Sequence, residues 1–495
     1  MRASRTMNRR RVATPSLSAR LGSHVTLQMQ PGGEIVASFY GHSVGLGKFD
    51  VGVADRVRDL RIGLPLIALG SSETDIDKEV ALLVRRLARH GLLEYRIGHS
   101  RSDSDQVIIE PQIASYWPQT PPLTDADTLV LSRFAYMRRR GNELVLESPR
   151  SGALFRICDP KTTAALTLLA APQSVKKLRR QDGFPGVELL SLLVDCRILF
   201  KVDAAKDSGM RPTEGSDSLV LWDFHDLLFH ARSTEGRHAN PLGGVCPYAG
   251  VVSPLPAVRP CWSGEKIDLA KFQSVSIADA EADLPVARIL RERHSVRSFD
   301  DRKPITLAEL SLFLDGTARV QSEWSGTLDL GGGNSTPPVS YASRPYPSAG
   351  SCYELELYLA VDKCEGLGQG FYHYDAGGHA LTAIEVRAPD FAAFLKSAEF
   401  AMGAPAVPQI LITMAARFGR VSWKYSAIAY SLILKDVGAL TQTFYTMATD
   451  MGLSGCAIGS FNIDLFSRMT GIEFYVEGPV GQFAIGRGAA TGAPG

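Results

Sequence analysis

Two cations and a hydroxyl lie within five residues of the C-terminal part of the chain: Arg293, Ser295 and Arg297. Planar guanidinium groups bind phosphate through paired hydrogen bonds, so this spacing predicts a phosphate-binding segment. The alternative is a run of surface charge at the end of a helix. Another cation, Arg487, lies between two glycines near the end of the chain.

Two loops of small residues can approach a flat ligand closely. Residues 347–351 read Pro-Ser-Ala-Gly-Ser, and small side chains let the backbone come near a ring. Taken alone, this sequence is also typical of a simple turn. Residues 452–461 are rich in glycine and serine, and their backbone N–H groups can donate to a ring nitrogen.

Helices and strands with clear patterns must position these residues. Asp283 and Pro285 predict the start of a helix that continues into residues 293–299. The capping box at residues 306–309 starts a second helix, which Gly316 would end.

The remaining pattern indicates an α+β domain. Residues 354–361 alternate between apolar and other residues, which predicts a half-buried strand, and residues 375–378 are typical of a hairpin turn. Residues 410–414 predict a strand buried on both faces, and a long apolar-faced helix ended by Gly452 follows. With a last strand at residues 483–485, the order predicts a mixed or antiparallel sheet.

The N-terminal half shows a helix followed by a strand in two places. Apolar residues at helical spacing follow residue 79, Gly91 can end that helix, and residues 92–97 resemble a strand. A second apolar face at residues 189–196 precedes a strand at 198–202, and residues 138–147 between them predict a hairpin. We predict two tandem winged-helix-like units.

Charge argues against nucleic acid as the partner of these units. Residues 21–110 hold 10 Lys and Arg against 12 Asp and Glu, whereas a phosphate-binding face needs an excess of cations. Peptide or protein binding is favoured, and pure scaffolding remains an alternative. The exposed edge of a wing can pair with an extended peptide as an added strand.

Composition indicates an ordinary globular chain. The 53 Lys and Arg and 52 Asp and Glu give a net charge of +1, and no run of about 18 apolar residues predicts a membrane helix. The seven cysteines are widely spaced, without a C-x-x-C pair, which favours a reducing cytoplasm. Six arginines within residues 1–21 predict a disordered arm, with a transit peptide as the alternative. His225, His230 and His238 suit a structural role better than a metal site, so we predict no metal.

The four clusters at 293–297, 347–351, 452–461 and 486–488, in this order, resemble the FMN-binding signature of the nitroreductase superfamily. Within it, the chain is similar to SagB-type thiazoline/oxazoline dehydrogenases, on two grounds. Trp423-Lys424-Tyr425 with Tyr430 resembles their Lys-Tyr catalytic pair, and the upstream winged-helix-like region resembles their peptide clamp.

The resemblance assigns roles to residues of this chain. It implies that Arg293, Ser295 and Arg297 contact the FMN phosphate, ribityl chain and pyrimidine edge. Ser348, Gly350 and Ser351 would line the isoalloxazine ring, the amides of Gly459 and Ser460 would face its N5 atom, and Arg487 would reach the phosphate. Gln442 is a further candidate contact.

The resemblance also implies a reaction. A thiazoline or oxazoline ring in a peptide would lose a proton to Lys424 or Tyr425 and a hydride to FMN, with reoxidation by O2. Neighbouring residues on a regular helix point about 100° apart, so both can act on one substrate only at a helix start or around the ligand. The chain departs from many relatives in two places: Ala439 stands where they have His, and Ser431 where they have Arg.

The resemblance further implies a homodimer with FMN at its interface, a peptide substrate and a cyclodehydratase partner. The competing functions are an NAD(P)H-dependent FMN nitro- or quinone reductase and a noncatalytic scaffold of a cyclodehydratase complex. The predicted organisation is a basic arm and lead-in (1–45), a tandem winged-helix-like peptide clamp (46–205), a connecting region (206–280) and a nitroreductase-like FMN domain (281–495).

Overall fold

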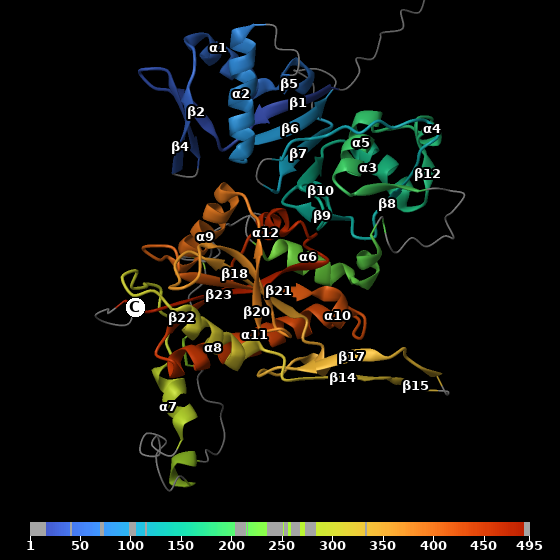
Figure 1. Cartoon of the computed structure of the whole chain (residues 1–495). Coiled ribbons are helices and arrows are strands. Elements are labelled where there is room, and N and C mark those ends of the chain that lie inside the picture. The colour runs from blue at the N-terminus through green and yellow to red at the C-terminus, as the bar shows by residue number, and fades with distance from the viewer. Residues whose placement is uncertain are drawn as a thin grey trace, which may run out of the picture. The chain divides into compact units, whose positions relative to one another are not determined.

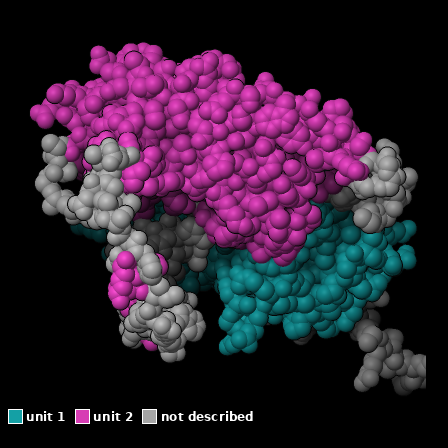
Figure 2. All heavy atoms as spheres, turned by 90° about the horizontal axis from the view of Figure 1, so that it is seen from below, with its two compact units in different colours: residues 1–217 teal, residues 218–495 magenta. Residues whose placement is uncertain are grey.

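The computed structural model describes residues 16–39, 42–69, 74–98, 105–113, 116–202, 214, 216–234, 251, 256–258, 268–272, 284–331 and 334–489. The chain divides into two compact units, residues 1–217 and 218–495, coloured separately in Figure 2. The arm at residues 1–15, His238, Asp283 and most of the predicted connecting region lie outside the described residues.

Unit 1 contains a seven-stranded antiparallel sheet in the order β5-β1-β6-β7-β11-β10-β9 (Figure 1). Two three-stranded sheets, β12-β8-β13 and β2-β3-β4, accompany it. The strands are β1 (Ser16–Leu21), β2 (Thr26–Met29), β3 (Glu34–Phe39), β4 (His42–Lys48), β5 (Leu64–Pro65), β6 (Leu93–Gly98), β7 (Val107–Pro111), β8 (Thr128–Leu131), β9 (Tyr136–Arg140), β10 (Glu143–Glu147), β11 (Ala153–Ile157), β12 (Gln173–Ser174) and β13 (Leu199–Val202). The helices are α1 (Val51–Ile62), α2 (Asp75–Arg89), α3 (Pro160–Thr167), α4 (Val175–Leu178) and α5 (Val187–Asp195).

Both predicted helix-strand pairs are present in unit 1. Helix α2 buries its predicted apolar face and is followed by β6, with Gly91 at a φ of 65° in the turn between them. Helix α5 is followed by β13, and the predicted hairpin is β9–β10. The two parts are joined more closely than tandem units would be, because β7 pairs with β11 and one hydrophobic cluster extends through both.

Residues 16–21 are ordered, contrary to the disorder expected for residues 1–21. These residues form β1, which pairs with β5 on one side and β6 on the other. Leu17, Ala19 and Leu21 alternate along β1 and are buried. The many arginines of residues 1–21 obscured this short apolar alternation.

Unit 2 contains a six-stranded antiparallel sheet in the order β20-β19-β18-β21-β23-β22 (Figure 1). Its strands are β18 (Leu355–Val361), β19 (Gly370–Asp375), β20 (Ala380–Ile384), β21 (Ile410–Arg417), β22 (Ser454–Ile458) and β23 (Glu477–Gly486). Two small sheets pair β14 (Ser322–Gly326) with β17 (Val339–Ser343) and β15 (Asp329–Gly331) with β16 (Asn334–Ser335). The helices are α6 (Phe224–Arg232), α7 (Pro285–Glu292), α8 (Leu307–Ala318), α9 (Ala388–Met402), α10 (Phe418–Ser422), α11 (Ala429–Asp450) and α12 (Ile463–Thr470). Unit 2 has the α+β architecture with an antiparallel sheet that the sequence predicted.

Helices cover both faces of the six-stranded sheet. On one face, Phe444 of α11 packs between Phe313 of α8 and Phe483 of β23, at ring distances of 5.3 and 5.4 Å. On the other face, Ala484 belongs to a hydrophobic cluster with side chains of α9 and α12. This arrangement explains why β21 is buried on both faces, as its continuous apolar sequence predicted.

Two predicted helix boundaries were wrong. Helix α7 ends at Glu292 rather than continuing into residues 293–299, which have no regular structure apart from a bridge at Phe299. The predicted capping box of α8 is present, but the helix passes through Gly316 and ends at Ala318. A Cβ atom at Gly316 would lie 2.8 Å from Met447 Cε, so this glycine permits close packing of α8 against α11.

The described part of the predicted connecting region after residue 217 belongs to unit 2. The indole N–H of Trp222 donates to Tyr475 O at 2.8 Å, and the buried His230 hydrogen bonds with the Tyr430 hydroxyl at 3.0 Å. Among the described residues no group of His, Cys, Asp and Glu is arranged to hold a metal ion. The described helices include none with the length and apolar character needed to span a membrane.

Candidate functional site

The predicted phosphate-binding residues lie in an irregular segment that follows α7. They are Arg293, Ser295 and Arg297. The segment is held by Val296 N, which donates to Gly455 O at 3.0 Å. Ser295 Oγ hydrogen bonds with the Tyr445 hydroxyl at 2.9 Å, and the Arg293 guanidinium lies 5.0 Å from the centre of the same ring.

The positive charge of this segment is not neutralised within the described residues. Neither Arg293 nor Arg297 forms an ion pair with any described carboxylate, and Arg297 is exposed. Arg297 lies beside the Cys456 thiol, whose pKa burial raises and this cation lowers. Two guanidinium groups in one short segment, neither paired with a described carboxylate, suit an anionic group such as a phosphate.

The glycine-rich loop after β22 begins beside this segment. Tyr445 links the two, because its hydroxyl also accepts a hydrogen bond from Ala457 N at 2.8 Å. In the described part of the chain, the backbone amides of Gly459 and Ser460 have no hydrogen-bond partner, and Gly459 is exposed. These two amides are therefore available as hydrogen-bond donors.

Arg487 forms an ion pair within the chain. Its guanidinium donates to both oxygens of Glu309 at 2.6 and 2.8 Å, and its backbone N–H donates to Gln409 Oε1. Glu309 is also the acidic residue of the α8 capping box. Within one chain, Arg487 thus supports the start of α8, and a phosphate would have to compete with Glu309 for it.

The other predicted ring-lining residues form a second group around residues 347–353. Gly350, Ser351 and Tyr353 all have positive φ values, of 58°, 53° and 46°. Ser348 Oγ and Ala349 N both hydrogen bond with the carboxylate of Asp436 on α11, each at 2.9 Å. The loop is therefore held in its unusual conformation by a helix that lies far away in the sequence.

The predicted catalytic pair meets this loop at Gly350. Lys424 and Tyr425 lie in the turn after α10, so the angle between neighbours on a regular helix does not separate them. Lys424 Nζ donates to Gly350 O at 3.3 Å. A Cβ atom at Gly350 would lie 2.6 Å from Lys424 Nζ and 2.5 Å from the Tyr425 hydroxyl, so both side-chain ends converge on this glycine.

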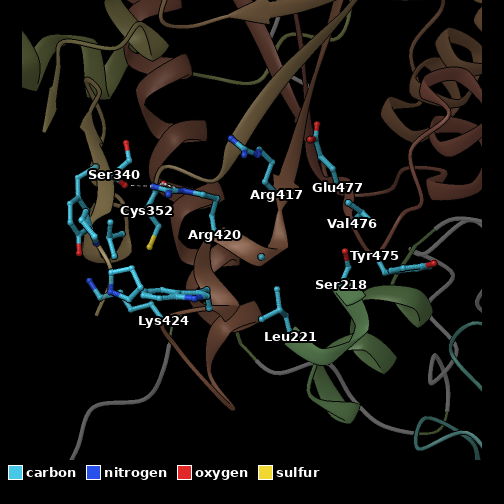
Figure 3. Close-up of a pocket in the computed structure, with 16 residues that line it drawn as sticks. Ser218, Leu221, Ser340, Cys352, Arg417, Arg420, Lys424, Tyr475, Val476 and Glu477 are labelled. Atoms are coloured by element: carbon cyan, nitrogen blue, oxygen red, sulfur yellow. Dashed lines mark hydrogen bonds between the residues drawn. The ribbon is translucent and has the colours of Figure 1, made fainter. Parts of the chain in front are cut away.

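A cavity of about 570 Å³ opens beside Lys424, within the usual range for small-molecule sites (Figure 3). Figure 3 shows Lys424 on one side of it and Glu477 on the other. Arg420 points toward Ser340 and Cys352 and donates to both backbone oxygens, which ties the β14–β17 hairpin to the loop. The aromatic side chains of Tyr341, Trp423 and Tyr475 also line the cavity.

Two buried carboxyl groups near the loop were missed as site residues. Glu354 is fully buried although its alternation with Leu355 had suggested an outward position, and Asp436 is 6% exposed. A carboxylate on the apolar stripe of α11, three residues after Ile433 and four before Leu440, was the available signal for Asp436. Gln442 is exposed on α11 and contacts Thr446 rather than either group.

The two groups lie at different points along α11. The first group contacts Tyr445 and the second contacts Asp436, nine residues earlier, which corresponds to about 13 Å along a helix. We call the residues around 293–297 the phosphate-type group and the residues around 347–353 the ring-type group. Within one chain, these two groups contact α11 at separate places. The groups present fit FMN. Among the described residues, two amides and two guanidinium groups have no partner that would compete with the cofactor, and a Cβ at Gly350 would displace Lys424 and Tyr425.

Comparisons with known proteins agree with this geometry. Residues 290–487 match the nitroreductase family, and residues 129–239 match cyanobactin oxidase ThcOx. A candidate nitroreductase of Methanocaldococcus jannaschii is 28% identical over 190 residues, which cover 38% of this chain and 84% of that protein. These matches support an oxidoreductase of the nitroreductase superfamily.

Solved structures with low sequence identity also match parts of the chain. A candidate nitroreductase from Ralstonia eutropha is 22% identical, with 42% of this chain and 84% of that chain covered and a TM-score of 0.31. A chain of the E. coli microcin synthetase complex with a bound truncated pro-peptide is 16% identical, with 51% and 84% covered and a TM-score of 0.35.

Proposed function

We propose that the chain is an FMN-dependent dehydrogenase that oxidises thiazoline or oxazoline rings of a peptide to thiazole or oxazole in modified-peptide biosynthesis. The observation that carries the proposal is the convergence of Lys424 and Tyr425 on Gly350, within the loop expected to line the flavin ring. The nitroreductase match of this unit and the cyanobactin oxidase match upstream support it.

The chain's own residues would hold FMN at both ends. Arg293 and Arg297 would bind its phosphate, and the free amides of Gly459 and Ser460 would donate to the ring. The loop around Gly350 would lie against the ring, where a larger residue would strike Lys424 and Tyr425. When bound, FMN accepts the hydride that an azoline ring loses on aromatisation.

Lys424 and Tyr425 would remove the matching proton. A neutral lysine amine or an ionised tyrosine phenolate can take a proton from carbon. The ends of both side chains lie beside Gly350 of the loop. The contact of Lys424 Nζ with Gly350 O fixes the direction of the amine. The cavity beside Lys424 would receive the heterocycle and the adjoining peptide.

We propose that the active species is a homodimer. The phosphate-type group and the ring-type group lie about 13 Å apart along α11, so two copies of the chain could each supply one group to a shared FMN. In each copy Arg487 would remain a support of α8.

Unit 1 would hold the peptide and meet a cyclodehydratase that makes the azoline. Strands β5 and β9 are the edges of its seven-stranded sheet, and an edge can accept an extended peptide as an added strand. Part of the unit lies in the segment that matches cyanobactin oxidase, residues 129–239. The winged-helix-like character of its helix-strand pairs is part of this proposal, as is a reducing, cytoplasmic location.

The test compares peptide oxidation by the wild type, Lys424→Ala and Tyr425→Phe. Mass spectrometry measures the rate at which a cyclised peptide loses two hydrogens. We expect Lys424→Ala to slow oxidation by about 10²-fold or more while flavin content is retained. Lys435→Ala is the control, because Lys435 is exposed on α11. Full-rate oxidation by Lys424→Ala contradicts the catalytic assignment. Flavin reduction by NAD(P)H but never by peptide favours the reductase alternative, and a colourless protein favours the scaffold.

A further inference from the structure

Ser348 lies at the centre of a hydrogen-bond cluster that contains two carboxyl groups. Its Oγ atom is 2.9 Å from Asp436 Oδ2, 3.0 Å from Tyr353 N and 3.4 Å from Glu354 Oε2. Tyr353 N can only donate, so Ser348 accepts that hydrogen bond. The remaining two contacts both join the serine to carboxyl oxygens.

The number of protons decides the state of the two carboxyl groups. A serine hydroxyl carries one proton, so Ser348 can donate to Asp436 or to Glu354 but not to both. The shorter contact is with Asp436, which also accepts from Ala349 N at 2.9 and 3.2 Å. These two donors, the Ser348 hydroxyl and the Ala349 N–H, suit an ionised Asp436. The remaining contact is a hydrogen bond only if Glu354 carries a proton and donates it.

The surroundings of Glu354 favour the neutral form. Its side chain is 0% exposed, and its Oε1 atom has no hydrogen-bond partner in the described part of the chain. The charged or titratable groups around it are Asp436 from α11 and Tyr346 and Cys352 from the loop, and no described Lys, Arg or His forms an ion pair with it. Burial, followed by the negative charge of Asp436, raises the pKa of Glu354 to about 8.

The cluster controls the loop that meets the proposed catalytic pair. Ser351 and Tyr353 hold positive φ values although they are not glycines, which is costly unless the surroundings impose it. The contacts of Ser348 fix the two ends of this strained segment, at Asp436 and at Tyr353 N. Gly350, which contacts Lys424, lies between them.

We propose that Glu354 is a positioning residue that carries a proton at neutral pH and donates it to Ser348, which fixes residues 347–353 so that Gly350 meets Lys424 and Tyr425. The effect on catalysis rests on the proposed function, whereas the protonation of Glu354 does not. When Glu354 loses this proton, Ser348 lies between two buried carboxylates, Glu354 and Asp436, and the loop loosens.

Glu354→Gln and Glu354→Ala test whether position 354 requires a hydrogen-bond donor, as proposed, or an ionised carboxylate. The amide of Gln can donate to Ser348 as a protonated acid does, but it cannot ionise. We expect Glu354→Gln to melt within a few degrees of the wild type at pH 6 and Glu354→Ala to melt well below both. Equal damage by the two variants at pH 6 would overturn the proposal.

The pH dependence has a defined sign. The pKa of Glu354 is higher in the folded protein than in the unfolded chain, so the unfolded chain releases this proton first as pH rises. The free energy of unfolding of the wild type should decrease as pH rises from the ordinary carboxyl pKa to about 8. That of Glu354→Gln should not show this decrease. The melting temperature of Glu354→Gln minus that of the wild type must therefore grow with pH. A constant difference would contradict the proposal.

Glu356→Gln is the matched control on the same strand. Its carboxylate contacts His373 and Arg417, at 3.3 and 3.5 Å. Burial raises the pKa of Glu356, but the hydrogen bond with His373 and nearby cations outweigh this effect and lower it. Glu356→Gln should therefore be less stable than the wild type at neutral pH.

In the oxidation assay, only Glu354→Gln should keep its rate above pH 8 better than the wild type. If the melting behaviour holds but the wild type oxidises no peptide, the proposed function fails and the proton assignment stands.

Discussion

Gly350→Ala tests whether the geometry at the loop controls the proposed catalytic pair. The new Cβ atom would lie 2.5 Å from the Tyr425 hydroxyl and 2.6 Å from Lys424 Nζ. Non-bonded contacts are favourable at about 3.5 Å, so each group must retreat by about 1 Å. The substitution therefore displaces both proposed proton acceptors together without removing either.

The size of the effect follows from this displacement. A misplacement of about 1 Å in an active site can cost about 10²-fold in rate, which corresponds to about 2.7 kcal/mol. The φ of 58° at Gly350 adds about 1–2 kcal/mol of backbone strain for alanine. We expect the variant to fold, to melt a few degrees lower and to oxidise the cyclised peptide about 10²-fold more slowly.

The assay measures peptide oxidation and thermal melting on the same samples. Gly403→Ala is the control, because Gly403 has a φ of 60° but no atom within 4 Å of the position that an alanine methyl group would take. It should melt lower to a similar degree and keep full activity. If Gly350→Ala and Gly403→Ala lose stability equally and both oxidise the peptide at the wild-type rate, the role of the loop is refuted.

Two further predictions concern the phosphate-type group and the sheet. Arg297→Gln should weaken FMN binding about tenfold in equilibrium dialysis, because a charged hydrogen bond to phosphate is lost, whereas Arg302→Gln should not; unchanged affinity would place the phosphate elsewhere. The hydrogen bond with Glu356 raises the pKa of His373, so this pair stabilises the folded protein fully below about pH 6.5 and loses that effect as pH rises through the raised value. His373→Gln should thus lower the melting temperature most near pH 6 and least near pH 9, and a difference independent of pH would contradict the pairing.

Local patterns predicted the elements that carry most of the site. The capping box of α8, the apolar stripe of α11 and the continuous apolar strand β21 each appear in the structure because one stretch of sequence contains the whole signal. The spacing of Arg293, Ser295 and Arg297 predicted a shared ligand, although in a helix. The helix ends before them, and Arg293 and Ser295 instead share a contact with Tyr445 of α11.

Contacts between distant residues could not be predicted in this way. The carboxylate of Asp436 lies 88 residues after Ser348 in the sequence, and Glu309 lies 178 residues before Arg487. Arg487 was therefore assigned to a phosphate without its partner, and Glu354 was placed on an outer face that the loop in fact covers. Buried pairing of this kind depends on which elements the fold brings together, and no single segment contains that information.

The source of the electrons tests the central claim most directly. The purified yellow protein would be mixed, without oxygen and without NAD(P)H, with a peptide that contains a thiazoline or oxazoline ring, and the visible flavin absorbance would be followed. We expect the absorbance to fall as the ring becomes a thiazole or oxazole. Absorbance that stays constant with the peptide but falls with NAD(P)H would contradict the proposed function.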